Sequence, residues 1–233
     1  MENRYLSGEY AAENPSYHVE DSAWKARQIL TMLRKHGLEP KTVCDVGCGA
    51  GEVLRQLQQK LPAQTMLHGF EISPQGFALA KTRENDRLRF FCEDFLAAQV
   101  DPCDLLLCID VFEHVEDYMG FLRKLRTKST YTIFHIPLDM SAQGVLRIKT
   151  IVANRVHVGH LHYFCKETAL LTLQDTGYEI VDWFYTASGI DLAKTLGAKL
   201  VAMPRKLAAF VSPDFTARVL GGYSMLVLAK GTR

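Results

Sequence analysis

The stretch Thr42–Gly51, TVCDVGCGAG, decides the fold of this chain. Its apolar start predicts a buried strand. The three alternating glycines after it predict a tight turn, because glycine adopts backbone conformations that other residues avoid and has no Cβ to hold a ligand away. A helical pattern follows from Glu52 to Lys60. The unpaired N–H groups at the start of that helix should therefore lie beside the turn.

A second apolar run, Met66–Phe70, ends in the carboxylate Glu71. A carboxylate at the tip of the neighbouring strand can accept two hydrogen bonds from a ribose diol. The strand, glycine-rich turn, helix, strand and acid together predict a nucleoside-binding site. The alternative is that the glycines only form a tight turn.

Strand and helix patterns alternate along the rest of the chain, which predicts a parallel sheet with right-handed crossovers. Serine followed by proline at 73–74 is a strong helix start. The predicted strands are 42–46, 66–70, 88–92, 104–109, 131–136, 178–185 and 223–229, and the predicted helices are 21–35 (capped by Asp21 or Ser22), 52–60, 73–84, 118–125 and 166–175, with an ambiguous segment around 144–152. Pro204 and Pro213 should break 187–221 into short helices.

Composition narrows the class of protein. The 233 residues, 48% of them hydrophobic, can bury one sizeable core, and the net charge of +1 gives no basic field to attract nucleic acid. The six cysteines form no C-x-x-C pair, so we expect free thiols in a reducing compartment. There is no apolar signal core and no run long enough to span a membrane, so we expect a soluble cytoplasmic protein without an integral membrane segment.

Four features in order resemble the class I S-adenosylmethionine-dependent methyltransferases: Asp45-x-Gly47-x-Gly49-x-Gly51, then Glu71, then Glu93-Asp94-Phe95, then Asp110. The resemblance covers about residues 42–136 well and the remainder in element order. It implies an α/β, Rossmann-like three-layer αβα sandwich with a mostly parallel seven-stranded sheet whose last strand is antiparallel. It also implies a single domain: a lid or helix at 1–38, a cofactor-binding half at 39–137, and a substrate-side half at 138–233 with an insertion at 187–221.

The resemblance implies S-adenosylmethionine as cofactor. It places Asp45 near the methionyl ammonium, Glu71 on the ribose, and Asp94 with the Phe95 backbone at the adenine. The cofactor-binding set it implies is Asp45, Gly47, Cys48, Gly49, Gly51, Glu71, Ile72, Asp94, Phe95 and Asp110, together with Tyr17 and Trp24 from the N-terminal lid. Asp45 could instead form only a turn, Asp110 could cap a helix, and Trp24 could simply pack on the sheet.

A nicotinamide dehydrogenase is the rival nucleotide-binding class. Its fingerprint is G-x-G-x-x-G, whereas here the third glycine comes one position early and Glu52 follows it. Asp45 and Glu52 would repel a diphosphate, but acids favour a ligand that carries a sulfonium and an ammonium. Charge therefore favours S-adenosylmethionine.

Methyl transfer to a hydroxyl needs a base for the departing proton. His114, just past the fourth strand, is one candidate, and His160 or His162 in the run from His157 to Phe164 is another. The second pair could instead only cap the next helix. The set Asp110, Glu113 and His114 resembles the divalent-metal position of methyltransferases in ubiquinone synthesis, but we predict no metal.

Two segments could shape the acceptor side. Tyr17, His18 and Trp24 suit a lid over the cofactor. The segment 187–221 could floor an apolar pocket, touch a membrane surface or contact a partner subunit. The residues that suggest this are Leu192, Leu196, Leu200, Val201 and Met203 among the apolar ones, and Lys194, Lys199, Arg205 and Lys206 among the basic ones.

The sequence therefore predicts methyl transfer from S-adenosylmethionine to a small molecule, with oxygen as the acceptor atom and nitrogen as the alternative. Protein acceptors and a non-catalytic nucleoside-binding module remain open, as does the choice between monomer and homodimer. Nucleic acid is not expected as a partner, since no N-P-P-Y-type motif follows the fourth strand. The last third departs from the ubiquinone branch, so no quinone substrate is carried over.

Overall fold

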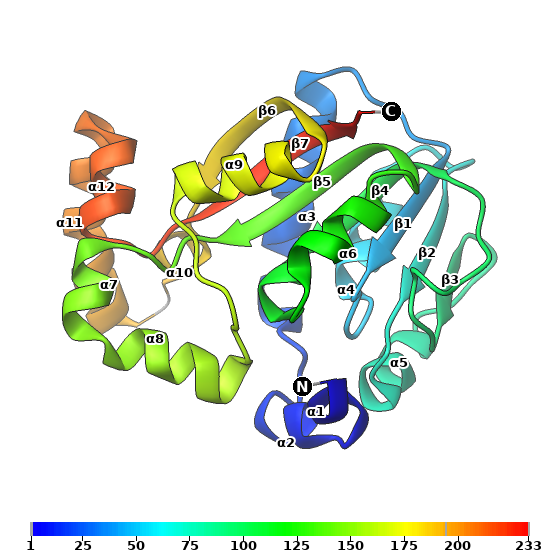
Figure 1. Ribbon diagram of the computed structural model, residues 1–233, viewed down its shortest axis with the longest axis horizontal. Coiled ribbons are helices and arrows are strands. Elements are labelled where there is room, and N and C mark those ends of the chain that lie inside the picture. The colour runs from blue at the N-terminus through cyan, green and yellow to red at the C-terminus, as the bar shows by residue number, and fades with distance from the viewer. Residues whose placement is uncertain (1, 194, 233) are drawn as a thin grey trace.

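A computed structural model describes residues 2–193 and 195–232, and its centre is one twisted sheet (Figure 1). The strands are β1 (Thr42–Val46), β2 (Met66–Phe70), β3 (Leu88–Phe91), β4 (Cys103–Ile109), β5 (Ser129–Pro137), β6 (Tyr178–Thr186) and β7 (Ser224–Gly231). Their spatial order is β3-β2-β1-β4-β5-β7-β6, and β7 is antiparallel to both of its neighbours while the other pairs are parallel. The predicted fold class is confirmed.

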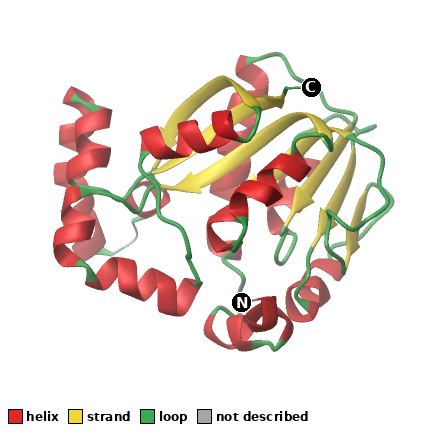
Figure 2. Ribbon diagram, viewed as in Figure 1, coloured by secondary structure: helices red, strands yellow, loops and turns green. Residues whose placement is uncertain are grey.

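Helices cover both faces of the sheet (Figure 2). The helices are α1 (Glu2–Leu6), α2 (Glu9–Glu13), α3 (Val19–Lys35), α4 (Glu52–Gln58), α5 (Pro74–Lys81), α6 (Tyr118–Leu125), α7 (Ala142–Arg147), α8 (Lys149–Ala153), α9 (Lys166–Asp175), α10 (Ser188–Asp191), α11 (Leu196–Val211) and α12 (Pro213–Val219), with a 3₁₀ turn η1 (Phe112–His114) and a π turn η2 (Asn154–Val158). α3 and α4 pack on one face, α6 and α9 on the other. This arrangement gives three layers.

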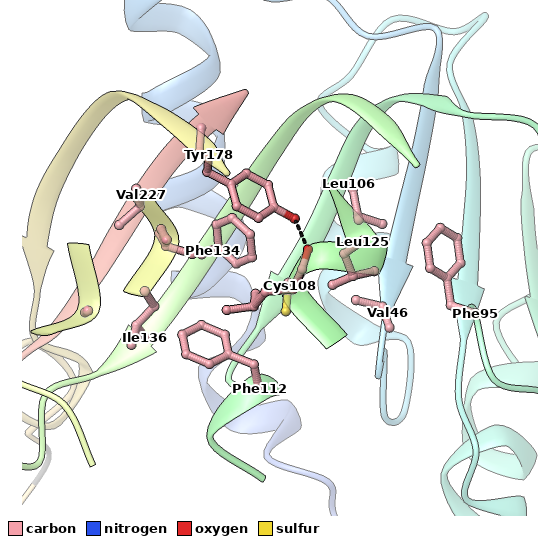
Figure 3. Packing of buried hydrophobic residues seen from close by; sticks show 14 of the residues in the cluster. Val46, Phe95, Leu106, Cys108, Phe112, Leu125, Phe134, Ile136, Tyr178 and Val227 are labelled. Carbon is pink, nitrogen blue, oxygen red and sulfur yellow. Dashed lines mark hydrogen bonds between the residues drawn. The ribbon is translucent and has the colours of Figure 1, made fainter. Parts of the chain in front are cut away.

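The structure of β4 explains why its sequence is a nearly continuous apolar run. Leu105 and Leu107 pack with the α3 side, while Leu106 and Cys108 pack with the α6 side. A strand buried on both faces cannot alternate apolar with polar residues. Figure 3 shows the α6 side of this core, where the buried Tyr178 hydroxyl donates to the carbonyl of Leu122 (3.1 Å) and is therefore paired.

Residues 2–20 are more structured than the sequence indicates. They form α1 and α2, and α3 begins at Val19 after His18, which takes a left-handed conformation (φ 56°). The predicted capping role of Asp21 or Ser22 was wrong, because both lie inside the helix and Asp21 pairs with Lys25 (3.1 Å). The predicted cap at Ser73 is confirmed, since its hydroxyl accepts from the N–H of Gly76.

The prediction that Pro204 breaks the insertion was also wrong. α11 runs through Pro204, whereas Pro213 does begin a new helix, α12, after the cap Ser212. A proline inside a helix removes one backbone hydrogen bond. Here packing holds the helix together: α11 lies along α12, and Arg205 donates to the carbonyls of Leu220 and Gly221.

α7, α8, η2, α11 and α12 form a group that we name the helical projection (Figure 1). α12 contacts both α7 and α11, so segments far apart in the sequence meet there. The predicted apolar floor is not formed by Leu200 and Met203, which are exposed, and Arg205 holds helix ends together instead. Lys194 lies outside the described residues, as do the side chains of Leu196, Lys199 and Val201. No described helix has the length and hydropathy needed to cross a bilayer.

Candidate functional site

The carboxyl ends of β1, β2, β4 and β5 meet at one edge of the sheet. The strand order changes direction between β1 and β4, and open parallel sheets bind ligands at such a switch point. The turn after β1, the acid after β2 and the residues after β4 and β5 all lie at this edge. The predicted site residues are thus brought together by topology.

The glycine-rich turn needs its glycines for two different reasons. Gly47, Gly49 and Gly51 have φ values of 68°, 54° and 73°, in the left-handed region that favours glycine. A Cβ on Gly51 would lie 2.4 Å from the ring of Phe90, so Gly51 is required by packing. A Cβ on Gly49 would meet only Tyr17, at an ordinary 3.5 Å. Gly49 is therefore favoured by its left-handed backbone and not by packing.

Glu71 is fixed by the backbone at the tip of β2. One carboxylate oxygen accepts from the N–H of Gly49 (2.8 Å) and the other from the N–H of Ser73 (2.8 Å). Burial nevertheless raises its pKa. The acid and the glycine turn are therefore one rigid unit rather than two neighbouring motifs.

Asp45, at the end of β1, is a buried acid with an unused oxygen. Its Oδ1 atom has no hydrogen-bond partner among the described residues, and the side chain is 2% exposed. Burial and the nearby Glu71 raise its pKa to about 8. Native proteins rarely leave a buried polar atom unpaired unless a ligand or ion completes it. The crevice is thus acidic and free of bulk, which suits a cationic nucleoside and disfavours a diphosphate.

The remaining predicted cofactor residues lie in the segments that follow β1, β2 and β3. Asp94 is exposed and accepts from the N–H of Leu96 (2.9 Å), while Phe95 is buried and packs edge-on against Phe70. Cys48 is buried within the turn and Ile72 is half-buried beside Glu71. What these residues bind stays a prediction.

Asp110 has protein partners that the sequence did not indicate. Its carboxylate pairs with Nζ of Lys25 (2.9 Å) and with Nδ1 of His135 (2.6 Å), and its φ of 55° is left-handed. Burial raises the pKa of Asp110, but His135 and Lys25 outweigh burial and hold it well below the usual range. The alternative of a helix cap is wrong, because η1 has no side-chain cap. Whether Asp110 also meets the cofactor stays a prediction.

A second cluster follows β4 and η2: Glu113, His114 and His160. The N–H groups of Leu161 and His162 donate to the carbonyl of Glu113 (2.8 and 3.1 Å), which ties the two segments together. The His114 and His160 rings lie 5.0 Å apart. Both Glu113 carboxylate oxygens are buried without a hydrogen-bond partner among the described residues.

Burial controls the charge of this cluster. It raises the pKa of Glu113 well above the usual value, with a further contribution from Asp110. Burial, followed by the nearby His160, lowers the pKa of His114 to about 4. His114 is therefore neutral at physiological pH.

His160 and His162 have different surroundings. Nδ1 of His160 lies 2.6 Å from a carboxylate oxygen of Asp139, which follows β5. Nε2 of His162 instead lies 2.9 Å from the carbonyl of Val115, and its ring packs against Tyr118. The geometry therefore favours His160 as a base and argues against His162.

Glu113, His114 and His160 could also hold a divalent cation. Each offers one ligand atom, and the three atoms lie within 4.8 Å of one another. Imidazole and carboxylate donors suit several first-row metals. The predicted absence of a metal stays a prediction.

The N-terminal segment places a row of tyrosine rings beside the glycine turn and the cluster of Glu113, His114 and His160. The rings of Tyr5 and Tyr10 are 4.9 Å apart and those of Tyr10 and Tyr17 are 5.4 Å apart, forming a row from His114 to the glycine turn. Tyr17 also hydrogen-bonds Ser73 (2.7 Å). Polar contacts from Arg4 and Asn14 to the carbonyl of His157 (3.1 Å each) anchor the row at its other end.

Trp24 takes a packing position. It is 4% exposed, and its indole N–H donates to Asp191 (3.2 Å) in α10. It lies edge-on to His135, the partner of Asp110. Trp24 therefore connects the insertion to the edge of the sheet. Its predicted contact with the cofactor stays a prediction.

Sequence reasoning missed Lys25, His135, Asp139 and the two tyrosines of α1 and α2. His135 and Asp139 had a usable signal, because both lie at the carboxyl end of a predicted strand. Lys25 had none, since a lysine on a helix is normally read as solvated. Tyr5 and Tyr10 lack a helical period.

A surface depression at the opposite edge of the sheet is lined by Leu38, Lys41, Asp104 and Tyr131 among others. There Asp104 accepts from the backbone N–H of Lys41 (2.7 Å) and Thr42 (2.9 Å). It lies away from the carboxyl edge and the groups above.

Comparison with known proteins identifies the family. A family described as a methyltransferase domain matches residues 18–182, which is most of the chain. The chain belongs to this family. The predicted resemblance to class I methyltransferases is confirmed.

Individual relatives agree on the fold. A tRNA U34 carboxymethyltransferase from Sulfurimonas denitrificans is 31% identical over 115 residues, which cover 45% of this chain and only 37% of the relative. The structure resembles magnesium protoporphyrin IX methyltransferase from Synechocystis PCC 6803 with bound SAH (TM-score 0.59, 20% identity, 90% of this chain and 83% of the other). It also resembles a Haloferax volcanii complex of the Trm112 methyltransferase activator with a putative methyltransferase (TM-score 0.66, 15% identity, 97% and 96% covered).

Proposed function

We propose that this methyltransferase-domain chain transfers the methyl group of S-adenosylmethionine to a hydroxyl oxygen of a small molecule, with His160 as the base. The cofactor suits the acidic crevice at the ends of β1 and β2. Asp45 and Glu71 there would face the ammonium and the ribose diol, and Gly49 leaves room for the nucleoside. The Synechocystis enzyme, which shares this fold, carries the demethylated cofactor SAH.

The observation that carries the acceptor assignment is the contact between Asp139 and His160. A carboxylate oxygen 2.6 Å from Nδ1 accepts a hydrogen bond from that nitrogen, which favours the tautomer with the proton on Nδ1 and leaves Nε2 as an acceptor. A neutral amine can attack a methyl group without help, whereas a hydroxyl needs a base at the moment of attack. An oriented Asp–His pair therefore favours oxygen over nitrogen.

The reaction balances without any other group. When bound, S-adenosylmethionine supplies the sulfonium methyl. The acceptor oxygen would form its bond to that carbon while the bond between the carbon and the sulfur breaks, so that S-adenosylhomocysteine leaves as a neutral thioether, and Nε2 of His160 would take the hydroxyl proton. His114, neutral because of its low pKa, adds no competing positive charge beside His160. The tyrosine row excludes water, so that the enzyme mainly aligns donor and acceptor.

The test is turnover of methyl-labelled cofactor with matched panels of phenols, alcohols and amines, for the native chain and for His160→Asn. We expect methylated hydroxyl products. We expect kcat to fall by about 10²–10⁴ in His160→Asn, with unchanged cofactor affinity. His162→Asn is the control, because it changes a histidine of the same segment whose Nε2 contacts the carbonyl of Val115 and not a carboxylate. Products on nitrogen, or equal losses in both variants, would contradict the proposal.

A further inference from the structure

Three elements of the helical projection, α7, α8 and η2, lack the buried face that helices normally have. None of the residues of α7, α8 or η2 is buried, although residues 142–158 include seven large aliphatic side chains. Several of these are more than half exposed: Val145, Leu146, Ile148, Val152 and Val156, with Leu146 reaching 86%. Short helices gain their stability mainly from packing an apolar face. This segment therefore presents apolar surface that nothing in the described chain covers.

α11 shows the same feature in a more ordered form. Five of its large apolar side chains are exposed: Leu200, Met203, Leu207, Phe210 and Val211, with Phe210 at 93%. The first four are spaced by three or four residues and Val211 follows Phe210 directly, which puts all five on one stripe about 100° wide at 3.6 residues per turn. Ala202 and the half-buried Arg205 point the other way, toward the rest of the chain. The stripe thus occupies the face that is normally polar.

The charges of these segments differ from those of the rest of the protein. Residues 142–158 and 187–221 together carry eight Lys or Arg and two Asp or Glu, a net charge of +6. The whole chain has a net charge of only +1, so the remaining residues carry −5. Arg147, Lys149, Arg155 and Lys206 are exposed, and within the described chain no carboxylate pairs with any of the four.

These features together point to one kind of partner: we propose that the helical projection binds the surface of an anionic lipid bilayer. Helices that lie in a membrane interface combine a large apolar stripe with Lys and Arg at its border. Lys206 lies beside the stripe of α11 in this way, and Arg147, Lys149 and Arg155 alternate with exposed aliphatic residues. Basic residues near an anionic surface each add to the affinity.

Two other occupants fit less well. A second copy of this chain, docked through the same face, would bring two +6 surfaces together, and like charges oppose such a contact. A protein partner would need grooves shaped to several separate convex helices. Lipid chains accept irregular apolar side chains of any shape, and headgroups meet scattered basic ones.

The projection is also connected to the candidate site. η2 leads directly into Gly159 and His160, and the carbonyl of His157 in η2 accepts from Arg4 and Asn14 of the N-terminal segment. Trp24 joins α10, next to α11, to the edge of the sheet. A surface bound to lipid would therefore be continuous with the segments that cover the acceptor side.

The experiment is flotation of the full chain with vesicles of phosphatidylcholine alone or with added phosphatidylglycerol. We expect partitioning into the anionic vesicles, weak binding to neutral ones, and weaker binding as salt is raised. Leu207→Glu with Phe210→Glu should lower the partition coefficient at least about tenfold. Lys149→Gln with Arg155→Gln should lower it about fivefold per residue on anionic vesicles only.

Leu171→Glu is the matched control, because Leu171 is an exposed leucine on α9, outside the projection (54% exposed). It should leave the partition coefficient unchanged, and circular dichroism should show that every variant is folded. Absence of binding to anionic vesicles would overturn the proposal, as would an equal loss in Leu171→Glu. The proposal would also be overturned if light scattering showed that the native chain is a dimer, that Leu207→Glu with Phe210→Glu abolishes the dimer, and that this double variant still binds vesicles. Flotation measures binding to vesicles and not turnover, so failure here leaves the proposed methyl transfer intact.

Discussion

The cofactor side of the candidate site is formed mainly by backbone groups, whereas the acceptor side is formed by side chains. The cofactor side uses backbone N–H groups, positive-φ glycines and two acids, all within residues 45–73. The acceptor side uses side chains from four distant segments: Tyr5 in α1, Glu113 and His114 after β4, Asp139 after β5, and His160 after η2. A site made of backbone is encoded locally, whereas a site made of side chains depends on how the whole chain folds.

The two sides share one electrostatic property. Each holds a buried acid that lacks a hydrogen bond among the described residues: Asp45 on the first side, Glu113 on the second. Asp110, between them, is paired with both Lys25 and His135. An unpaired buried charge is costly, so proteins keep one mainly where a ligand or a proton compensates it. This difference separates Asp45 and Glu113, whose oxygens lack partners among the described residues, from Asp110, which already has two partners.

The largest expected effect is on the acceptor side, in Asp139→Asn. The asparagine amide can donate to Nδ1 of His160, which would place the proton on Nε2 and remove the base. We expect kcat to fall at least about 100-fold and the pH dependence of kcat to change, while calorimetry finds the same affinity for S-adenosylhomocysteine. A loss of cofactor affinity with an unchanged kcat would remove the distinction between the two sides.

On the cofactor side, Asp45→Asn should stabilise the ligand-free protein. The pKa of Asp45 is raised from 3.8 to about 8, so the ionised carboxylate destabilises the fold increasingly as pH rises from about 4, and the cost is complete above about 8. Each pKa unit corresponds to about 1.4 kcal/mol, so the gain should reach a few kcal/mol at alkaline pH and be smaller near pH 5.

Urea unfolding at several pH values measures this gain. Asp104→Asn is the control, because Asp104 is an acid at the other edge that already accepts two backbone hydrogen bonds. It should destabilise the chain. If Asp45→Asn stabilised equally at all pH values, the assignment of an uncompensated charge at Asp45 would be incorrect. The Asp45→Asn variant should also bind S-adenosylhomocysteine more weakly, because it lacks the carboxylate that would face the ligand's ammonium group.

A smaller effect is expected where the lid meets the cofactor side. Tyr17→Phe removes the hydrogen bond to Ser73 but keeps the ring beside Gly49. A hydrogen bond of this kind contributes about 0.5–1.5 kcal/mol, so the dissociation rate of S-adenosylhomocysteine should rise about 2–10-fold. Stopped-flow measurement decides this. A rate equal to that of the native chain would show that Tyr17 does not cover the cofactor.

The smallest expected effect concerns metal. If Glu113, His114 and His160 serve in proton transfer and do not bind a metal ion, removing metal ions with EDTA should leave the turnover rate within about twofold of the untreated rate. Loss of turnover that Mg²⁺, Mn²⁺ or Zn²⁺ restores would show instead that the three residues hold a cation. Glu113→Gln should then prevent the restoration.

The contrast between the two sides also explains how far the sequence could be interpreted. Glycine spacing and an acid at a strand end are local signals, so the turn after β1 and the position of Glu71 at the tip of β2 were predictable. The tie between Glu113 and the 161–162 backbone, and the approach of Asp139 to His160, join segments that no local pattern relates. Pro204 failed as a helix breaker because packing against α12 outweighs one lost hydrogen bond. Tertiary contacts therefore determine the three features that the sequence did not predict.

The most direct test of the account is calorimetry of S-adenosylhomocysteine with the native chain and with Gly49→Val. A Cβ at Gly49 meets only Tyr17, so the variant should fold with an unchanged circular dichroism spectrum, at a cost of about 1–2 kcal/mol for the left-handed conformation. The account predicts one site per native chain and no detectable binding in the variant. Equal binding by both chains, or binding of a nicotinamide dinucleotide in its place, would contradict it.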